Sequence, residues 1–222
     1  MVDASFAEVP RQRNSREDNA LIKDGEVPQS LLGNAKVRAH KDLNARWTKK
    51  NNETHYGYKD HVKVDVKDKL ILKAVITAAS VHDSQAFDEL IDEGDRVVYA
   101  DSACSGEPIE AALAAKNVEP QINEPERSGN RRPQAARRVS EANQKGTRRH
   151  PLSEEQKARN REKSRTRSRV EHVFAQMSGS MKALYQRCIG MKRNAACLLL
   201  TNLVCNMLRF EQIKRLKLNA AA

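Results

Sequence analysis

The sequence contains three carboxylates whose surroundings suit chemistry on phosphate groups. Asp101 ends the apolar run Val97-Val98-Tyr99-Ala100 and is followed by small residues. An acid at the C-terminal tip of a buried strand is where α/β folds place metal ligands or catalytic acids. Asp3 lies in the first strand-like segment, and Glu171 lies on an arginine-rich helix. Because these acids come from three distant segments, we interpret them together as a metal-dependent phosphate site.

The segments around these acids predict a mixed α/β fold. Short apolar runs bounded by turn residues predict strands at residues 2–6, 56–66, 69–77, 97–100 and 118–122. The second and third runs are adjacent and predict an antiparallel hairpin, whereas the later strands alternate with helices and predict parallel crossovers. One of these helices is an alanine-rich segment over residues 107–116. We therefore expect a mixed five-stranded sheet flanked by helices.

Further helix signals lie before and after the later strands. Asp83 or Ser84 can cap a helix whose apolar face includes Phe87. The capping box Ser153-Glu154-Glu155-Gln156 predicts a helix start, and Gly179 is its predicted end. A last amphipathic helix is predicted over residues 191–215. We expect its apolar residues to be core: Leu198, Leu199, Leu203, Met207 and Leu208.

The helix that carries Glu171 has two different halves. From Lys157 to Arg169 nearly every second residue is basic, and this spacing scatters the charges around the whole circumference of a helix. No ordinary core can bury that half. The following residues Val170, Val173, Phe174 and Met177 form one apolar stripe. The C-terminal half is therefore predicted to dock while the N-terminal half projects.

The length of 222 residues suits one well-buried domain. We assign residues 1–215 to that domain and residues 216–222 to a tail. Residues 11–54 are polar without a sustained period, so we treat them as an insertion after the first strand. Within it, Trp47 is the only tryptophan and lies among cations. Trp47 either anchors the insertion or stacks on a base, and anchoring is the more common role.

The net charge of +11 is concentrated in one segment. Residues 127–169 contain 15 basic and 4 acidic residues, whereas the rest of the chain has 25 of each. A basic segment of this kind attracts a polyanion, and nucleic acid is the usual one. The alternative for residues 127–150 is a solvated, disordered stretch, because blocks of like charge repel one another.

Each acid also has an ordinary interpretation. Asp3 could be a polar residue near a terminus, and Asp101 could cap the helix that follows it. Glu171 could pair with Arg167, which lies four residues earlier. His82 is expected to brace the start of a helix instead of binding a metal. Without further constraints, each acid alone is weak evidence for a site.

Cysteine usage and hydropathy favour the cytoplasm. The four cysteines include no C-x-x-C pair, which favours reduced thiols over a disulfide framework or a zinc site. Met1 leads into a short strand and not into a signal peptide. The most apolar stretch, residues 195–208, contains polar residues and is shorter than the roughly 20 residues that span a bilayer. We expect a soluble protein with no membrane partner.

Five stretches of the sequence resemble DDE transposases of bacterial insertion sequences, most closely the insertion-sequence-five type. They occur in the family's order between Met1 and about Arg209. Each stretch is short, but five in the right order are specific. The stretches are Val2-Asp3-Ala4-Ser5, Tyr56-Gly57-Tyr58-Lys59-Asp60-His61, His82-Asp83-Ser84-Gln85, Tyr99-Ala100-Asp101-Ser102-Ala103 and Arg167-Ser168-Arg169-Val170-Glu171-His172-Val173-Phe174.

The resemblance implies a ribonuclease-H-like fold and metal-dependent DNA strand cleavage and strand transfer during transposition. It implies that Asp3, Asp101 and Glu171 are the catalytic acids and converge as ligands of Mg²⁺ or Mn²⁺, with two ions expected. The implied partners are transposon ends and target DNA, in a bacterial cytoplasm where the DNA-bound protein associates with the nucleoid. The residues expected to bind DNA phosphates are Arg159, Arg161, Lys163, Arg165, Arg167, Arg169 and Lys182.

The sequence also departs from the family's pattern. Ser164 stands at the position of a family tyrosine and Ser178 at that of a lysine, although Lys182 follows one turn later, so we expect altered phosphate positioning. Members of the family carry a helical region before the first acid, and because only two residues precede Asp3 here, we expect this chain to lack that region. We expect an active domain that works with a second copy or an upstream transposase half. The alternatives are a silent fragment that only binds DNA or regulates transposition, and a basic RNA-binding or ribosomal protein.

Overall fold

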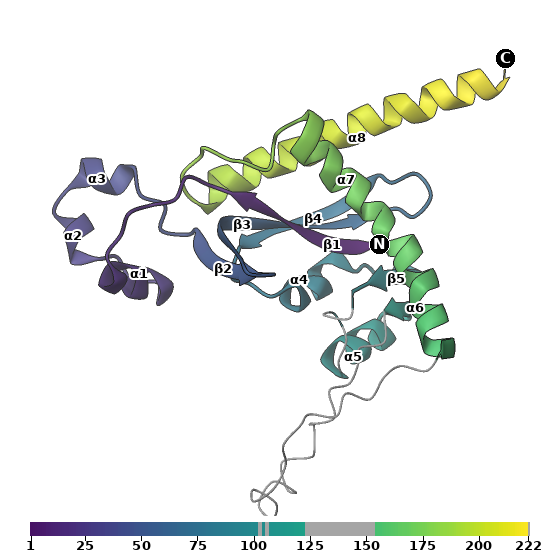
Figure 1. The fold of residues 1–222 in the computed structure, drawn as a ribbon, viewed down its shortest axis with the longest axis horizontal. Coiled ribbons are helices and arrows are strands. Elements are labelled where there is room, and N and C mark those ends of the chain that lie inside the picture. Colours follow the sequence, from purple (N-terminus) through teal and green to yellow (C-terminus); the bar gives the residue numbers. More distant parts are fainter. Residues whose placement is uncertain (102–103, 105–106, 123–153, 222) are drawn as a thin grey trace, which may run out of the picture.

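The computed structural model describes residues 1–101, 104, 107–122 and 154–221. Strands dominate the first half of the chain and helices the second (Figure 1). The strands are β1 (Val2–Glu8), β2 (Arg46–Lys50), β3 (Glu53–Val64), β4 (Ile71–Ala78), β5 (Val97–Ala100) and β6 (Glu119–Ile122). The helices are α1 (Arg16–Lys23), α2 (Gln29–Leu32), α3 (Ala35–Ala39), α4 (Asp83–Leu90), α5 (Glu107–Ala115), α6 (Glu154–Arg167), α7 (Glu171–Ala175) and α8 (Met191–Ala221).

The described strands form two sheets. In the larger, antiparallel sheet, the long strand β3 pairs with β1 on one edge and with β2 and β4 on the other. Strands β5 and β6 form a parallel pair, and β5 lies beside β1. The mixed α/β class and the hairpin are therefore confirmed. The expected single five-stranded sheet is not formed by the hydrogen bonds of the described residues, since the four-residue strand β5 forms its ladder with β6.

Gly57 is the point at which three strands meet. It pairs with Glu8 of β1 and with Arg46 of β2, and its φ is +147°. A Cβ at this position would lie 2.3 Å from the carbonyl oxygen of Ala7. The close approach of β1 to β3 therefore requires a residue without a side chain.

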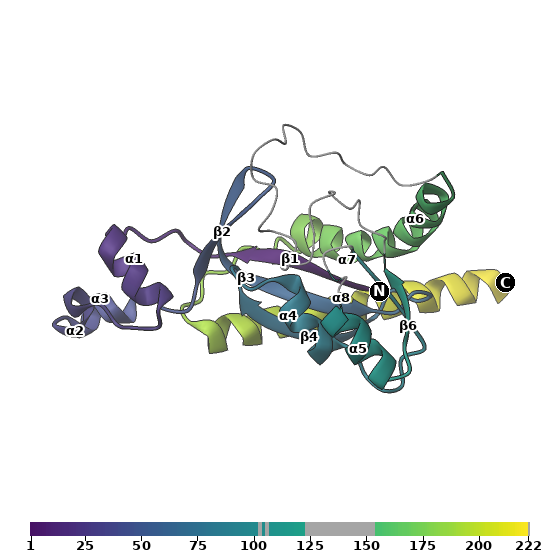
Figure 2. The same cartoon turned by 90° about the horizontal axis from the view of Figure 1, so that it is seen from below.

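The insertion contains three helices that its polar composition did not predict. Ser15 accepts a hydrogen bond from the Asp18 N–H at the start of α1, and Asn34 accepts one from the Val37 N–H at the start of α3. The helices span only four to eight residues, so they are too short to show a sustained apolar period. They lie at one end of the larger sheet (Figure 2).

The two faces of the larger sheet are covered by different helices. Val2 on one face packs with Phe87 of α4 and Leu113 of α5. Val62 on the other face packs with the helices that follow α6 and with α8. Asp3 lies opposite Val62 in the ladder, and paired residues share a face. The acid of the first strand therefore faces the helical segment that carries Glu171.

The predicted docking of the C-terminal half of the glutamate helix is confirmed within the described residues. The N-terminal half projects only in part, because Lys163 Nζ donates to the Ile122 carbonyl of β6. Val170, Val173 and Met177 are buried against the sheet. Three of the six basic residues of α6 are exposed, namely Arg159, Arg161 and Arg165, and the other three are half-buried. The helical segment continues through a 3₁₀ turn at Ser168–Val170 and a π turn at Gln176–Ser180, close to the predicted end. Ser153 of the predicted capping box and residues 127–153 of the basic segment lie outside the described residues.

The expectation that the apolar residues of α8 form core is wrong for most of them. Leu198 is fully buried, but four others are between 45% and 62% exposed: Leu199, Leu203, Met207 and Leu208. A helix that lies on a sheet buries one side only, and in α8 that side includes Asn194, Thr201 and Asn202. The helix extends beyond the sheet and beyond its predicted end (Figure 1). A contiguous exposed apolar surface of this kind is typical of a contact with another surface.

A buried polar contact fixes α8 on the sheet. Asp60 of β3 is fully buried, and its Oδ1 accepts a hydrogen bond of 3.2 Å from Asn202 Nδ2. Asp60 Oδ2 and Asn202 Oδ1 have no hydrogen-bond partner. Burial raises the pKa of Asp60 to about 7, and the hydrogen bond from Asn202 opposes this shift.

We predict that Asp60→Asn stabilises the fold at pH 8 by about 1–3 kcal/mol, the usual cost of an unsatisfied buried polar group. Between about pH 4 and pH 7 native Asp60 binds more protons than it does in the unfolded chain, so this group's contribution to stability falls as pH rises. The measurement is urea unfolding of both proteins from pH 5 to pH 8. Their difference isolates Asp60 from His61 and the N-terminal amine, whose pKa values burial lowers. A pH-independent difference would contradict the prediction.

Candidate active site

Asp3 is held in a fixed position on β1 by two hydrogen bonds. Its Oδ1 accepts from the Ala4 N–H at 2.8 Å, and its Oδ2 accepts from Arg167 Nη1 at 2.8 Å. The Asp3 and Arg167 side chains are only about one-fifth exposed, at 20% and 19%. The site thus contains an ion pair between the first strand and the end of α6.

Charged groups around Asp3 act on the pKa of its carboxyl group. Burial raises the pKa, while the Ala4 N–H and the cations Arg167 and Lys50 oppose the shift. The neighbouring Glu171 carboxylate raises the Asp3 pKa further. Asp3 and Glu171 are therefore close enough to repel one another, and Lys50 from the end of β2 lies near the same site.

Arg167 and Glu171 lie one helical turn apart. Arg167 ends α6, and Glu171 is the exposed first residue of α7. The alternative in which Arg167 pairs with Glu171 is not the observed one, because the described ion pair of Arg167 is with Asp3. The buried Arg167 Nε has no hydrogen-bond partner, so the guanidinium is not fully satisfied by this ion pair.

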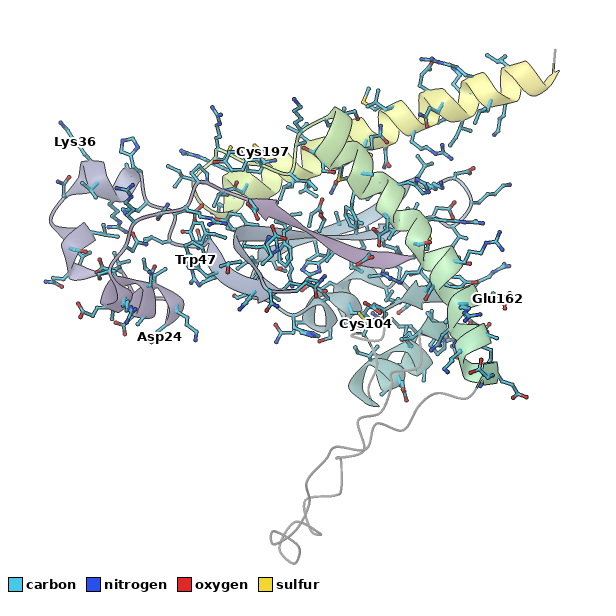
Figure 3. The ribbon with its side chains drawn as sticks, viewed as in Figure 1. Asp24, Lys36, Trp47, Cys104, Glu162 and Cys197 are labelled. Carbon is cyan, nitrogen blue, oxygen red and sulfur yellow. The ribbon has the colours of Figure 1, made fainter. Side chains whose placement is uncertain are left out.

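Asp101 follows β5 and is exposed. Its backbone carbonyl accepts a hydrogen bond of 2.9 Å from the N–H of the buried Cys104, which Figure 3 labels. Burial and the carboxylates of Asp83, Asp101 and Asp3 together raise the pKa of Cys104 to about 12, while Arg167 opposes them. Asp3 in β1 and Asp101 just after β5 thus both raise the pKa of the same thiol.

The three acids do not form a complete metal-binding group in this structure. Within residues 1–101, 104, 107–122 and 154–221, no three His, Cys, Asp or Glu side chains are grouped so that they could hold a metal ion. The ion pair with Arg167 brings Asp3 to the helical turn before Glu171, and the Asp3 and Asp101 carboxylates both raise the pKa of Cys104. Arg167 provides the positive charge that Asp3 would otherwise require from a cation.

The basic residues predicted to bind phosphate differ in how exposed they are and in whether they bond to other parts of the protein. Lys163 Nζ donates to the Ile122 carbonyl at 3.0 Å, and Arg167 is bonded to Asp3. Ser178 donates to the carbonyl of Phe174 at 2.9 Å, while Ser164 is half-buried on α6. The predicted phosphate-binding residues with exposed side chains are Arg159, Arg161, Arg165, Arg169 and Lys182.

A cavity of about 360 Å³ lies between β5, β6 and α6, next to these basic residues. Tyr99 contributes from β5, two residues before Asp101, and Thr166 contributes from the residue before Arg167. The remaining lining side chains are Gln121, Arg159, Glu162 and Lys163. The cavity is therefore lined by two predicted phosphate-binding residues, Arg159 and Lys163, and lies next to the chain segments of Asp101 and Arg167.

Sequence reasoning missed Asp83 as a neighbour of the site. Asp83 Oδ1 accepts from Lys59 Nζ at 2.9 Å and lies 3.8 Å from His61 Nδ1. Its carboxylate is the first charge that raises the Cys104 pKa after burial itself. In the sequence, the polar run Lys59-Asp60-His61 on β3 was the signal that could have indicated a polar neighbour such as Asp83. The role predicted for His82 is confirmed, since His82 caps α4 by accepting from the Ser84 N–H at 3.3 Å.

A comparison with family models decides the classification. The model of the transposase DDE domain matches residues 1–207, which is nearly the whole chain. The chain belongs to the transposase DDE domain family. Membership indicates transposase function and, in general, a polynucleotidyl transferase that acts on DNA. No solved structure matches the chain.

Within this transposase domain, the matched range includes Asp3, Asp101 and Glu171 together with Arg167. Members of the family typically use divalent metal ions, and carboxylates are suitable ligands for them. Among the helices described here, none is both long and apolar enough to pass through a membrane.

We predict that the Asp3–Arg167 ion pair contributes about 1.5–3 kcal/mol to the stability of this transposase domain, because both charges are largely buried. The test is a double-mutant cycle with Asp3→Asn and Arg167→Gln, measured by urea unfolding. The matched control is the exposed Glu154–Lys157 pair, which has a similar distance of 2.9 Å and should show no measurable coupling. If the two cycles gave the same coupling energy, the prediction that the Asp3–Arg167 pair contributes more to stability than an exposed pair would be contradicted.

Proposed function

We propose that the chain is the catalytic domain of an insertion-sequence transposase that cleaves and joins DNA strands, with Asp3, Asp101 and Glu171 as its catalytic acids. The observation that carries the proposal is the largely buried Asp3, bonded to Arg167 one turn before Glu171. Two elements far apart in sequence thus bring a strand acid and a helix acid together within the range that matches the family.

The residues present fit a hard divalent cation in their chemistry. Asp3, Asp101 and Glu171 offer carboxylate oxygens, and the repulsion between Asp3 and Glu171 is what a bound cation would relieve. These three residues would hold Mg²⁺ or Mn²⁺ once Arg167 releases Asp3. Such ions would supply activation of a water or a terminal 3′-hydroxyl and charge stabilisation of the leaving oxygen.

The chain's own cations bind and orient the DNA. Arg167, after leaving Asp3, can grip a phosphate with two parallel hydrogen bonds, because its planar guanidinium matches two phosphate oxygens. The exposed arginines of α6 lie on the preceding turns and would follow the DNA backbone. Lys50 adds a positive charge on the β2 side of Asp3. Asp3 would then have a source of phosphate contacts on each side, Lys50 on one and the α6 arginines on the other.

A silent DNA-binding domain is the second candidate. It is favoured by the Asp3–Arg167 ion pair and by the absence of a three-ligand metal group from the part of the chain that the structure describes. The exposed arginines of α6 would still attract DNA in such a protein. The two candidates differ in metal-dependent chemistry and not in DNA binding.

We predict that the chain nicks or joins DNA with Mg²⁺ or Mn²⁺ and that Asp3→Asn, Asp101→Asn and Glu171→Gln each lower the rate at least about 100-fold. Each substitution removes a charge but keeps the shape of the side chain. The matched control is Glu110→Gln, an exposed acid on α5, which should leave the rate unchanged. The measurement is strand cleavage and strand transfer of labelled DNA.

Two outcomes separate the candidates. If wild type and all variants nick DNA equally and without metal, the assignment of Asp3, Asp101 and Glu171 as catalytic acids is wrong. Salt-sensitive DNA binding without any nicking by the wild-type chain would favour the silent domain instead.

We also predict that Arg161→Gln with Arg165→Gln lowers the salt dependence of duplex binding by about 2 in the slope of log K against log salt, since each phosphate contact contributes about 0.9. Both side chains are exposed on α6. The matched control is Lys36→Gln with Arg38→Gln, which removes the same charge from exposed positions on α3. Equal losses of slope in the two double variants would show that only net charge matters.

A further inference from the structure

A second cavity, of about 310 Å³, lies where the insertion meets the larger sheet. Helix α1 forms one wall, and β2 with the start of β3 forms the other. Trp47, Tyr56 and Ile22 provide apolar surface, while Arg16, Lys23 and Asn19 are polar lining residues from α1. All of its lining residues belong to the described part of the chain, and none is acidic. Its volume is within the range of small-ligand pockets.

Trp47 provides a fixed aromatic surface in this cavity. Its ring lies 4.6 Å from the Tyr56 ring, centroid to centroid, at an interplanar angle of 37°. The Arg11 guanidinium lies 5.7 Å from the Trp47 ring centroid. The anchoring role expected for Trp47 is therefore present, yet the residue remains 39% exposed. Figure 3 shows Trp47 at the junction between the insertion helices and the sheet.

The wall opposite α1 is held rigidly. Arg46 Nη2 donates to the Ile22 carbonyl at 2.7 Å, and Arg46 Nη1 donates to the Leu43 carbonyl at 2.7 Å. The bond to Ile22 ties β2 to α1 and sets the separation of the two walls, while the bond to Leu43 holds the Arg46 guanidinium in place. The cavity is therefore built by the fold and does not depend on a loose side chain.

We propose that this cavity binds one unpaired base of a DNA strand, which stacks on Trp47 while Arg16 and Lys23 contact the neighbouring phosphates. The inference rests on the proposed function and identifies single-stranded DNA as a substrate form. An aromatic platform beside cations, without a carboxylate, suits a flat base attached to an anionic backbone.

Strand β2 connects this cavity to the acids. Lys50 lies three residues after Trp47, a span of roughly 10 Å along a strand. Lys50 acts electrostatically on Asp3, and its Nζ lies 5.8 Å from the Phe6 ring centroid. A DNA strand held at Trp47 could therefore follow β2 toward Asp3.

The test uses the emission of Trp47, which reports on this cavity alone because the chain has no other tryptophan. The probes are a dye-labelled single-stranded oligonucleotide and an abasic oligonucleotide of the same length and charge. Anisotropy of the dye measures total binding, and quenching of Trp47 measures entry of a base. We expect quenching by the base-containing probe only, with about 5-fold to 150-fold tighter binding than the abasic probe.

Variants locate the effect in the cavity. Ala20→Phe places a ring in the cavity from α1 and should abolish quenching. Arg16→Gln with Lys23→Gln should weaken binding of both probes. Lys36→Gln removes a charge from the outer end of the insertion, away from Trp47, and should change neither signal (Figure 3). Urea unfolding of each variant checks that the fold is kept.

The outcomes distinguish this inference from the proposed function. Equal quenching by the two probes, or unchanged quenching in Ala20→Phe, overturns the base-binding cavity. If metal-dependent strand cleavage persists in that case, the proposed function stands without it. If neither probe binds the wild-type chain, the base-binding cavity also fails, and the proposed function is then decided separately by metal-dependent strand cleavage of duplex DNA.

Discussion

The ion pair between Asp3 and Arg167 is the interaction on which the arrangement of this domain depends. It joins two residues 164 positions apart, and it is largely shielded from water. A buried charge that loses its partner is strongly destabilising, so the first strand and the end of α6 are held together. The apolar stripe that includes Val170 and Val173 then continues the contact across the sheet. As a result Glu171 begins α7 beside the strand acid.

The same interaction explains why the domain can be stable before it engages a substrate. Burial and the nearby Glu171 carboxylate both disfavour a negative charge on Asp3. The positive charge of Arg167 compensates this effect. A metal ion at the carboxylates and a phosphate at the guanidinium could replace this pair by two favourable pairs. The catalytic site would then assemble only when metal and DNA bind, and many enzymes prevent reaction in the absence of substrate in this way. Lys50 on one side and the α6 arginines on the other favour anionic DNA at this position.

Local patterns predicted those elements that bury one side against the sheet. The first strand, the hairpin and the stripe from Val170 to Met177 were predictable because their apolar spacing repeats over several residues. The helices of the insertion were not, because they are short and are held by caps such as Ser15. The apolar residues of α8 misled the prediction, since Leu203 and Met207 are as apolar as Leu198 but lie on the side away from the sheet.

The sequence by itself determined the class of the fold, the position of the basic charge and the identity of the three acids as candidates, because these follow from residue types and their order. Only the tertiary structure decided that Asp3 pairs with Arg167, that Asp83 acts on Cys104 beside Asp101, and that Trp47 both anchors the insertion and lines a cavity. The physical reason is that these contacts join segments far apart in the chain. Their distances depend on how strands and helices pack and not on any local pattern.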